Sequence, residues 1–128
     1  MVPLVEYASV SGIPIISLLT NAQIEKTVQQ TITSGADVIK LKDGTVYAPG
    51  TVIAATADAV LTGRKRLMSV STCLKGEYGQ SDVSIGVPVV LGKDGVERIV
   101  ELDLSKKTAA RFAGSVAAVK KAIAALKS

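Results

Sequence analysis

The sequence predicts an α+β fold in which long helices pack on a twisted antiparallel sheet. Three observations predict it: an amphipathic helical pattern over residues 21–33, another at the end of the chain, and alternating strand patterns between residues 67 and 102. With 128 residues, 48% of them hydrophobic, the chain is long enough for one domain, residues 1–128. Only 3% of the residues are aromatic, so we expect an aliphatic core.

The first sixteen residues, MVPLVEYASVSGIPII, are unusually apolar for the beginning of a domain. Their branched aliphatic residues are Val2, Leu4, Val5, Val10, Ile13, Ile15 and Ile16. Pro3, Gly12 and Pro14 argue against a continuous helix, so we expect an extended segment. Another part of the molecule should cover these side chains.

A helix is expected over residues 21–33. Thr20 can cap it, with the Gln23 side chain reaching back to the backbone of Thr20. One face carries apolar residues at four-residue spacing: Ile24, Val28 and Ile32. Ser34 and Gly35 should interrupt this helix, after which residues 36–41 (ADVIKL) fit either a buried strand or one further helical turn.

The stretch after Gly44 predicts a second helix, because Pro49 suits a first turn and Gly63 suits a C-terminal stop. Its apolar stripe consists of Val52, Ile53, Thr56, Ala59 and Val60. At its entry, Thr45, Tyr47 and Pro49 are the best candidates to face a ligand, since backbone N–H groups there have no partner within the helix. The alternative is structural, with Thr45 as the helix cap and Tyr47 as a packed ring.

Strands are expected over residues 67–74, 83–92 and 96–102, joined by turns into an antiparallel meander. Pro88 has no N–H to donate, so its strand should lie at a sheet edge or face a bulge there. A final helix should begin after Ser105, which can cap it. Its apolar stripe consists of Ala109, Phe112, Val116, Val119, Ile123 and Leu126.

The sequence argues against two classes of partner, nucleic acids and membranes. The net charge is +4, from 15 Lys and Arg against 11 Asp and Glu, and the basic clusters are typical of solvated helix faces and helix ends. We therefore expect no nucleic-acid partner. No apolar run approaches the roughly 18 residues of a membrane span, so we expect no membrane partner and a cytoplasmic protein.

Histidine is absent from the sequence, and Cys73 is its only cysteine. These two facts exclude disulfides within the chain, metal sites built on histidine or thiol clusters, and every catalytic triad or dyad that needs an imidazole. No metal site is expected. We expect Cys73 to be a small buried apolar residue, because no neighbouring Cys or His would activate its thiol.

Several long motifs follow one another in a characteristic order. They are MVPLVEYASVSGIPI, ADVIKLKDGTVYAP and KRLMSVSTCLKGEYGQSDVSIGVPVVLGKDGVERIVELDLS, followed by the closing amphipathic helix. In order and spacing, the chain resembles the second half of the L-lactate and L-malate dehydrogenases, and among them the lactate-dehydrogenase-like malate dehydrogenases. The resemblance covers essentially the whole chain. It implies the C-terminal domain fold of that family, with the Rossmann half absent.

The resemblance implies oxidation of malate to oxaloacetate in the intact enzyme, with NAD as cofactor. The family's catalytic histidine lies just before the MVPL segment and belongs, with its aspartate and the substrate-binding arginines, to the absent half. No catalytic residue is therefore expected in this chain, which should be inactive alone. By the same resemblance, Thr45 lines the substrate pocket and Pro49 lies beside the nicotinamide ring. The implied partners are the Rossmann half and further copies, in a dimeric or tetrameric homo-oligomer.

Two other functions fit the same sequence. A stand-alone oligomeric scaffold or binding module would keep this fold without catalysis, and the absence of histidine agrees with it equally well. The chain would alternatively be half of a lactate dehydrogenase, because threonine at the position of Thr45 is commoner in that branch of the family. The residue that mainly separates the two substrates lies in the missing half.

Overall fold

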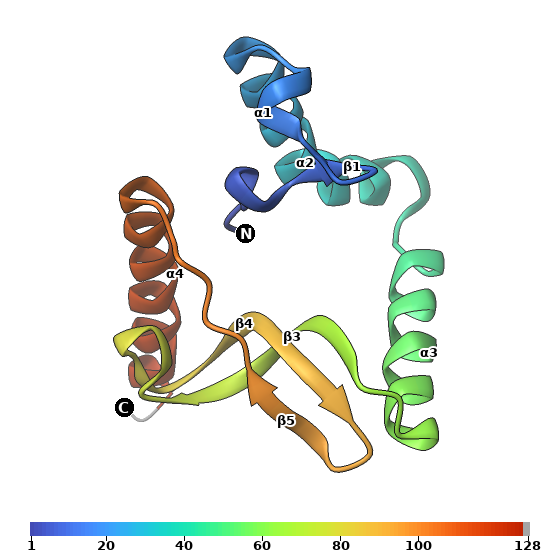
Figure 1. The fold of residues 1–128 in the computed structure, drawn as a ribbon, viewed down its shortest axis with the longest axis vertical. Helices are drawn as coiled ribbons and strands as arrows, with labels where there is room; N and C mark the ends of the chain where they lie inside the picture. Colours follow the sequence, from blue (N-terminus) through green and yellow to red (C-terminus); the bar gives the residue numbers. More distant parts are fainter. Residues whose placement is uncertain (127–128) are drawn as a thin grey trace.

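The structure is a computed structural model that describes residues 1–126. Its elements in chain order are η1 (Val5–Tyr7), β1 (Ser9–Val10), β2 (Ile13–Pro14), α1 (Ile15–Leu18), α2 (Asn21–Lys42), α3 (Tyr47–Thr62), β3 (Arg66–Lys75), η2 (Glu77–Gly79), β4 (Ser81–Gly92), β5 (Gly95–Ile99) and α4 (Lys106–Ala125). Figure 1 shows the sheet of β3, β4 and β5 between α4 and α3, with the N-terminal elements and α2 above it. This arrangement confirms the predicted α+β class.

The main sheet is an antiparallel meander in the order β3-β4-β5, as the alternating patterns predict. The β3–β4 pairing is long, running from Arg66 opposite Leu91 to Leu74 opposite Val83 before a register shift. The β4–β5 pairing is short and contains a shift between Val90 and Leu91. The central strand β4 therefore carries most of the backbone hydrogen bonding of the sheet.

Pro88 lies in this central strand, and the nearest register shift falls later in β4, between Val90 and Leu91. The expectation of an edge strand or a bulge at Pro88 is therefore wrong. The Pro88 carbonyl accepts a hydrogen bond of 2.8 Å from the Val100 N–H, which places the polar side of this residue toward the chain that leaves β5. The β5 ladder ends one residue earlier, at Val89 opposite Ile99. In a strand, the N–H and C=O groups of one residue point to the same side. The missing N–H of Pro88 therefore lies beyond the end of β5, and no hydrogen bond between β4 and β3 is lost.

Helix α2 begins as predicted and ends nine residues later than the expected boundary at residue 33. Thr20 and Gln23 form the capping box, with the Thr20 N–H donating to Gln23 Oε1 over 2.9 Å. Gly35 does not interrupt the helix, because one glycine costs only about 1 kcal/mol against alanine in a helix interior. The turn at Asp43, with φ of 56°, ends the helix instead. Residues 36–41 are therefore helical.

The core of the described residues is aliphatic, as expected, and centres on β4. Its buried members are Ala59, Leu74, Val83, Val87, Val89, Leu91 and Val116. In β3 and β4 these residues occupy alternate positions, so they share one face of the sheet. Helices α3 and α4 both contact β4 and contribute Ala59 and Val116 to the core. Burial of this one face holds the sheet and the two helices together.

Helix α4 confirms part of its predicted stripe. Ser105 caps it by accepting a hydrogen bond from the Thr108 N–H over 3.3 Å. The stripe residues that are buried or half-buried are Phe112, Val116, Val119 and Ile123. Ala109 and Leu126 are exposed. Thr108 is buried in the first turn, where its hydroxyl accepts a hydrogen bond from the Ser105 hydroxyl. The α3 stripe is similarly partial, since Val52 and Ile53 are exposed.

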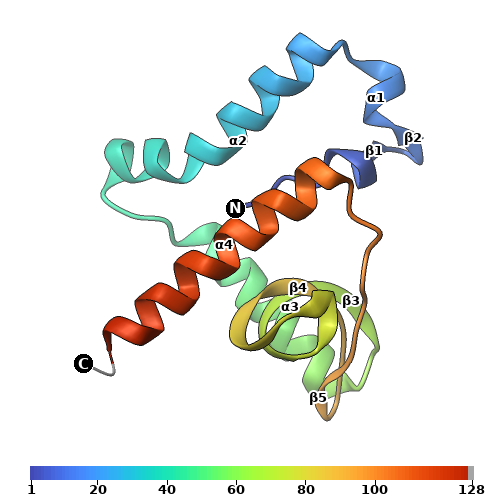
Figure 2. The same ribbon diagram turned by 90° about the vertical axis from the view of Figure 1, so that its left-hand side faces the viewer.

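The N-terminal segment lies beside the beginning of α4 (Figure 2). The Tyr7 hydroxyl donates to the Asp103 carbonyl over 2.8 Å, and the Ser105 N–H donates to Glu6 Oε1 over 3.3 Å. Residues 2–5 are half-buried, whereas Val10, Ile13 and Ile16 are about half exposed or more. The expectation that the whole opening segment is covered is therefore met only for its first part.

The contact at Glu6 predicts a measurable pH dependence. Hydrogen bonds from its own backbone N–H, from the Thr108 side chain and from Ser105 hold the pKa of the Glu6 carboxyl below its ordinary value of 4.5. A lowered pKa stabilises the fold above the ordinary value and ceases to do so as the pH falls through the folded-state value. Because Glu6 is exposed to water, we expect this contribution to be less than about 1 kcal/mol.

The comparison variant is Glu6→Gln. Between about pH 5 and pH 3, we expect the free energy of unfolding to fall more steeply for the unsubstituted chain than for the variant. Only the unsubstituted chain has the Glu6 carboxylate, which binds a proton on unfolding in this range. Urea unfolding at a series of pH values measures both slopes. Equal slopes across this range would contradict the role given to Glu6.

Candidate functional site

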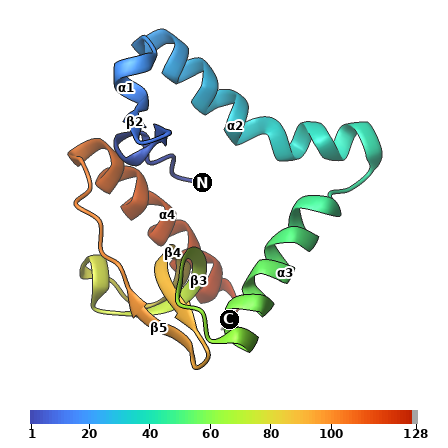
Figure 3. The ribbon, with the colours of Figure 1, turned by 45° about the vertical axis from the view of Figure 1, so that its right-hand side comes forward.

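Thr45 and Pro49 lie at the connection between α2 and α3, where Figure 3 shows the two helices meeting away from the sheet. Helix α3 begins at Tyr47, and its cap residue Val46 makes no side-chain capping bond. Thr45 precedes that cap and is exposed, so its alternative role as the helix cap is wrong. Pro49 is the third residue of the helix, where its missing N–H removes no helical bond.

The ring of Tyr47 is not packed, which contradicts the structural alternative for this residue. Its side chain is 81% exposed. The Lys42 ammonium lies 5.0 Å from the ring centroid, within the range of a cation–π contact. The hydroxyl and the aromatic face of Tyr47 are therefore open to a partner beside Thr45.

Apolar side chains surround this connection and are open to solvent. We call them the α2–α3 patch: Ile39, Leu41, Val46, Tyr47, Val52 and Ile53, each more than half exposed. A run of exposed large apolar residues on two consecutive elements is typical of a surface that another protein segment covers. Thr45 and Pro49 are placed within this surface rather than within a closed site.

Across residues 1–126, no group of three or more His, Cys, Asp or Glu side chains is arranged to hold a metal ion. The shifted pKa values belong to structural contacts. The Glu77 carboxylate accepts from the Lys75 N–H, which lowers its pKa, and a hydrogen bond and ion pair with Glu97 raise the pKa of Lys65. These groups stabilise turns and strand ends.

Cys73 is exposed, so the prediction that it is buried is wrong. Its strand neighbour Leu74 is 1% exposed. Because side chains alternate along a strand, Cys73 must face away from the core when Leu74 faces it. It shares the outer face of β3 with Ser69 and Ser71, which are also exposed.

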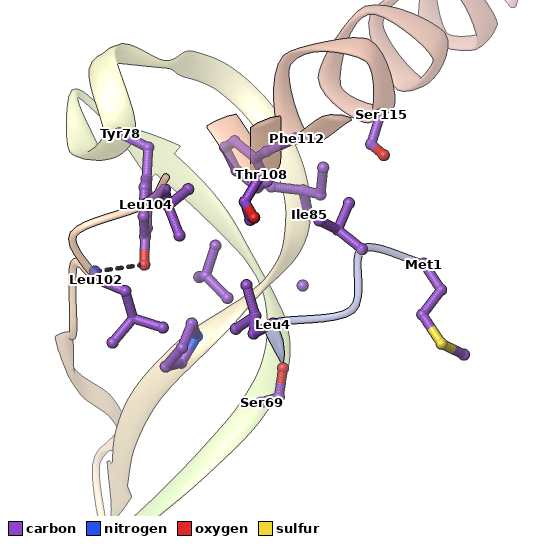
Figure 4. A pocket seen from close by; sticks show the side chains of 14 residues that line it. Met1, Leu4, Ser69, Tyr78, Ile85, Leu102, Leu104, Thr108, Phe112 and Ser115 are labelled. Carbon is purple, nitrogen blue, oxygen red and sulfur yellow. Dashed lines mark hydrogen bonds between the residues drawn. The ribbon is translucent and has the colours of Figure 1, made fainter. Parts of the chain in front are cut away.

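Two of the cavities that flank the N-terminal segment have volumes above 400 Å³, and neither of these is lined by Thr45 or Pro49. The first, of about 430 Å³, lies between that segment, the sheet, the chain after β5 and α4 (Figure 4). The second, of about 740 Å³, lies between α2 and α4, with Glu6, Glu25 and Arg111 among its lining residues. Sequence reasoning identified neither cavity, because each is assembled from segments far apart in the chain.

Within the part of the chain that the structure describes, no helix combines the length and the apolar character needed to cross a membrane.

Comparison with known proteins identifies the family. The model of the lactate/malate dehydrogenase alpha/beta C-terminal domain matches residues 1–128. A malate dehydrogenase of Bacteroides fragilis is 43% identical over 128 residues, which are 99% of this chain and 41% of that protein. A malate dehydrogenase of Nitrosococcus oceani is 41% identical, with 98% of this chain and 41% of that protein covered.

Solved structures agree with these relatives. The malate dehydrogenase of Salinibacter ruber matches with a TM-score of 0.95 and 37% identity, over 98% of this chain and 42% of that one. The malate dehydrogenase of Cryptosporidium parvum matches with a TM-score of 0.92 and 32% identity, also over 98% and 42%. The chain thus spans about two-fifths of the length of the proteins it matches. It belongs to the lactate/malate dehydrogenase family, a family of NAD-dependent oxidoreductases, and corresponds to its C-terminal domain.

Proposed function

We propose that residues 1–128 form the substrate domain of an NAD-dependent malate dehydrogenase, which oxidises malate to oxaloacetate. The observation that carries this proposal is the match of the whole chain to malate dehydrogenases, at 43% identity in Bacteroides fragilis. The exposed connection that bears Thr45 and Pro49 supports it, because it offers one wall of a pocket without the reactive groups. The rest of the enzyme supplies the opposite wall.

Within that pocket, Thr45 contacts the substrate and Pro49 contacts the nicotinamide ring. The Thr45 hydroxyl is exposed at the end of α2 and can donate to, or accept from, an oxygen of a hydroxy acid. The Pro49 ring is exposed and apolar, which suits one face of the nicotinamide. NAD, when bound, accepts the hydride. The glycines of this chain lack the strand–turn–helix setting of a dinucleotide cradle, so the NAD phosphates are held outside these residues.

Proton transfer also depends on the rest of the enzyme. Removal of the hydroxyl proton during oxidation needs a base with a pKa near neutrality, and this chain has no histidine. The carboxylates with shifted pKa values, Glu6 and Glu77, have lowered values and are committed to backbone N–H groups. The isolated chain is therefore inactive, and a histidine of the other half acts as the base.

The protein associates with the Rossmann half and with further copies, as a homo-oligomer in the cytoplasm. The exposed apolar side chains of the α2–α3 patch support the association. Its side chains are more than half exposed in the single chain. Burial of apolar surface at about 25 cal/mol per Å² provides the driving force for covering it.

A domain replacement tests the proposed function. The 128 residues of this chain replace the matched stretch of the Bacteroides fragilis malate dehydrogenase, and NADH oxidation is followed with oxaloacetate and, separately, with pyruvate. We expect turnover with oxaloacetate, because the chain supplies the missing pocket wall. A folded but inactive hybrid would contradict the assignment. By the family resemblance, the preference between oxaloacetate and pyruvate is set mainly by the Bacteroides fragilis half, so the pyruvate assay checks that this half is intact.

A further inference from the structure

The tripeptide Lys-Asp-Gly occurs twice in the chain, at residues 42–44 and 93–95. An aspartate that precedes glycine can isomerise, because the backbone nitrogen of the glycine can attack the side-chain carboxyl carbon of the aspartate. Glycine has no Cβ to hinder this approach. Both aspartates are exposed and both glycines are half-buried. Local sequence and exposure therefore do not distinguish the two sites, whereas their backbone settings do.

Gly44 lies in the connection between α2 and α3, outside any helix or strand (Figure 3). Its N–H has no hydrogen-bond acceptor among residues 1–126. On either side, the Asp43 N–H donates to the Ile39 carbonyl over 2.8 Å, and the Gly50 N–H donates to the Val46 carbonyl over 2.9 Å. Neither bond involves the peptide unit that joins Asp43 to Gly44. This unit can therefore rotate without breaking a hydrogen bond to any described residue.

Gly95, by contrast, is the first residue of β5 and pairs with Gly92 across the turn that joins β4 to β5. Rotation of the peptide unit between Asp94 and Gly95 would pull Gly95 out of this pairing. The hairpin is also held from outside, because Glu97 Oε2 lies 2.8 Å from Lys65 Nζ in the segment after α3. Ring closure at Asp94 therefore requires local opening of the hairpin, whereas ring closure in the α2–α3 connection does not.

We propose that Asp43 is a site of covalent modification, at which aspartate converts to isoaspartate, and that the fold protects Asp94 from the same reaction. The Gly44 nitrogen forms a bond to Asp43 Cγ, while the N–H proton and the hydroxyl of the protonated carboxyl group leave as water. The product is a five-membered succinimide. Water then adds to the former main-chain carbonyl carbon of Asp43, and the bond from that carbon to the Gly44 nitrogen breaks. Atoms balance over the two steps, and nothing is oxidised or reduced.

The modified link directly precedes Thr45. The isoaspartyl chain continues through the former side chain, so the backbone between α2 and Thr45 becomes longer by one carbon atom. The net charge is unchanged, because a main-chain carboxylate replaces the side-chain carboxylate. The modification therefore changes the position of Thr45 relative to α2. The effect of this shift on turnover rests on the proposed function, whereas the modification itself does not.

The experiment follows isoaspartate at both sites while the purified chain is kept at neutral pH and physiological temperature for several weeks. Peptide mapping measures it, since an isoaspartyl peptide has an unchanged mass and a different chromatographic retention. We expect isoaspartate to form at least about tenfold faster at Asp43 than at Asp94, because only Asp94 depends on opening of the hairpin. In concentrated urea the two rates should agree within about twofold, because the unfolded chain presents the same tripeptide at both sites.

Gly44→Ala removes the proposed site. A Cβ built on Gly44 meets no atom within 4 Å, and the φ of Gly44 is not in the left-handed region, so alanine fits there. Its methyl group hinders attack by the backbone nitrogen, and isoaspartate at Asp43 should fall severalfold. Gly50→Ala is the matched control, because its Cβ would also meet nothing within 4 Å and no aspartate precedes it. It should leave both rates unchanged.

Equal rates at the two sites of the folded chain, or a faster reaction at Asp94, would overturn the inference. Isoaspartate that forms at Asp43 only in urea would overturn it as well, as would a rate at Asp43 that Gly44→Ala does not reduce. The peptide map does not depend on catalysis, so an inactive domain-replaced enzyme would contradict the proposed function and leave this inference to its own test.

Discussion

Leu74→Ala should lower the free energy of unfolding by about 3 kcal/mol, a large share of the stability of a domain of this size. The Leu74 side chain is 1% exposed and packs in the cluster that joins β3, β4, α3 and α4. Truncation removes its buried methyl groups and leaves a cavity that the surrounding strands cannot close. Urea unfolding followed by circular dichroism measures the difference.

Leu67→Ala is the matched control, because the same residue type on the same strand is 69% exposed. Its truncation removes little buried apolar surface, so it should change the free energy of unfolding by no more than about 0.5 kcal/mol. Similar losses for both variants would mean that the core does not lie on the face of β3 that carries Leu74.

Thr45→Val should lower kcat/KM for oxaloacetate about tenfold in the domain-replaced enzyme, which corresponds to about 1.4 kcal/mol of transition-state stabilisation. Valine keeps the shape of threonine and removes only the hydroxyl that we assign to the substrate. Steady-state kinetics with oxaloacetate at saturating NADH measures the loss.

The control for this variant is Thr62→Val, at the other end of α3. The Thr62 hydroxyl donates to the Asp58 carbonyl within the helix over 2.6 Å, so its removal should leave kcat/KM unchanged. Equal activity of Thr45→Val and the unsubstituted enzyme would remove Thr45 from the substrate pocket.

Local signals in the sequence predicted the ends of elements best. Helices α2 and α4 begin after Thr20 and Ser105, and α3 ends before Gly63, as the sequence predicts. These signals are reliable because a cap depends on a few adjacent residues. The meander was also predictable from the sequence, because alternation of apolar and polar residues along residues 67–74 and 83–92 indicates strands with one buried face.

The errors arose where a local rule competes with long-range structure. Gly35 lies within an unbroken helix because its cost is small against 22 residues of helix. Pro88 sits in the central strand because the adjacent strand ends beside it, which only the register reveals. Cys73 is exposed because strand phase, rather than residue type, decides which face it occupies.

The candidate site shows a different limit. Thr45 and Pro49 were singled out because backbone groups are open at a helix entry, and the resemblance to a family supplied their roles. The cavity beside Met1 was not predictable, since it joins residues 1–4 to residues about 70 to 110 positions away in the chain. The exposed α2–α3 patch explains why so apolar a sequence has a small core: part of its apolar surface is directed outward.

The central claim is that this chain forms one wall of a pocket whose reactive groups lie elsewhere in the enzyme. The most direct test is the initial rate of NADH oxidation by the purified 128-residue chain with oxaloacetate, at enzyme concentrations of tens of micromolar. We expect a rate equal to that of buffer. A rate that rises in proportion to chain concentration, and survives further purification, would contradict the claim.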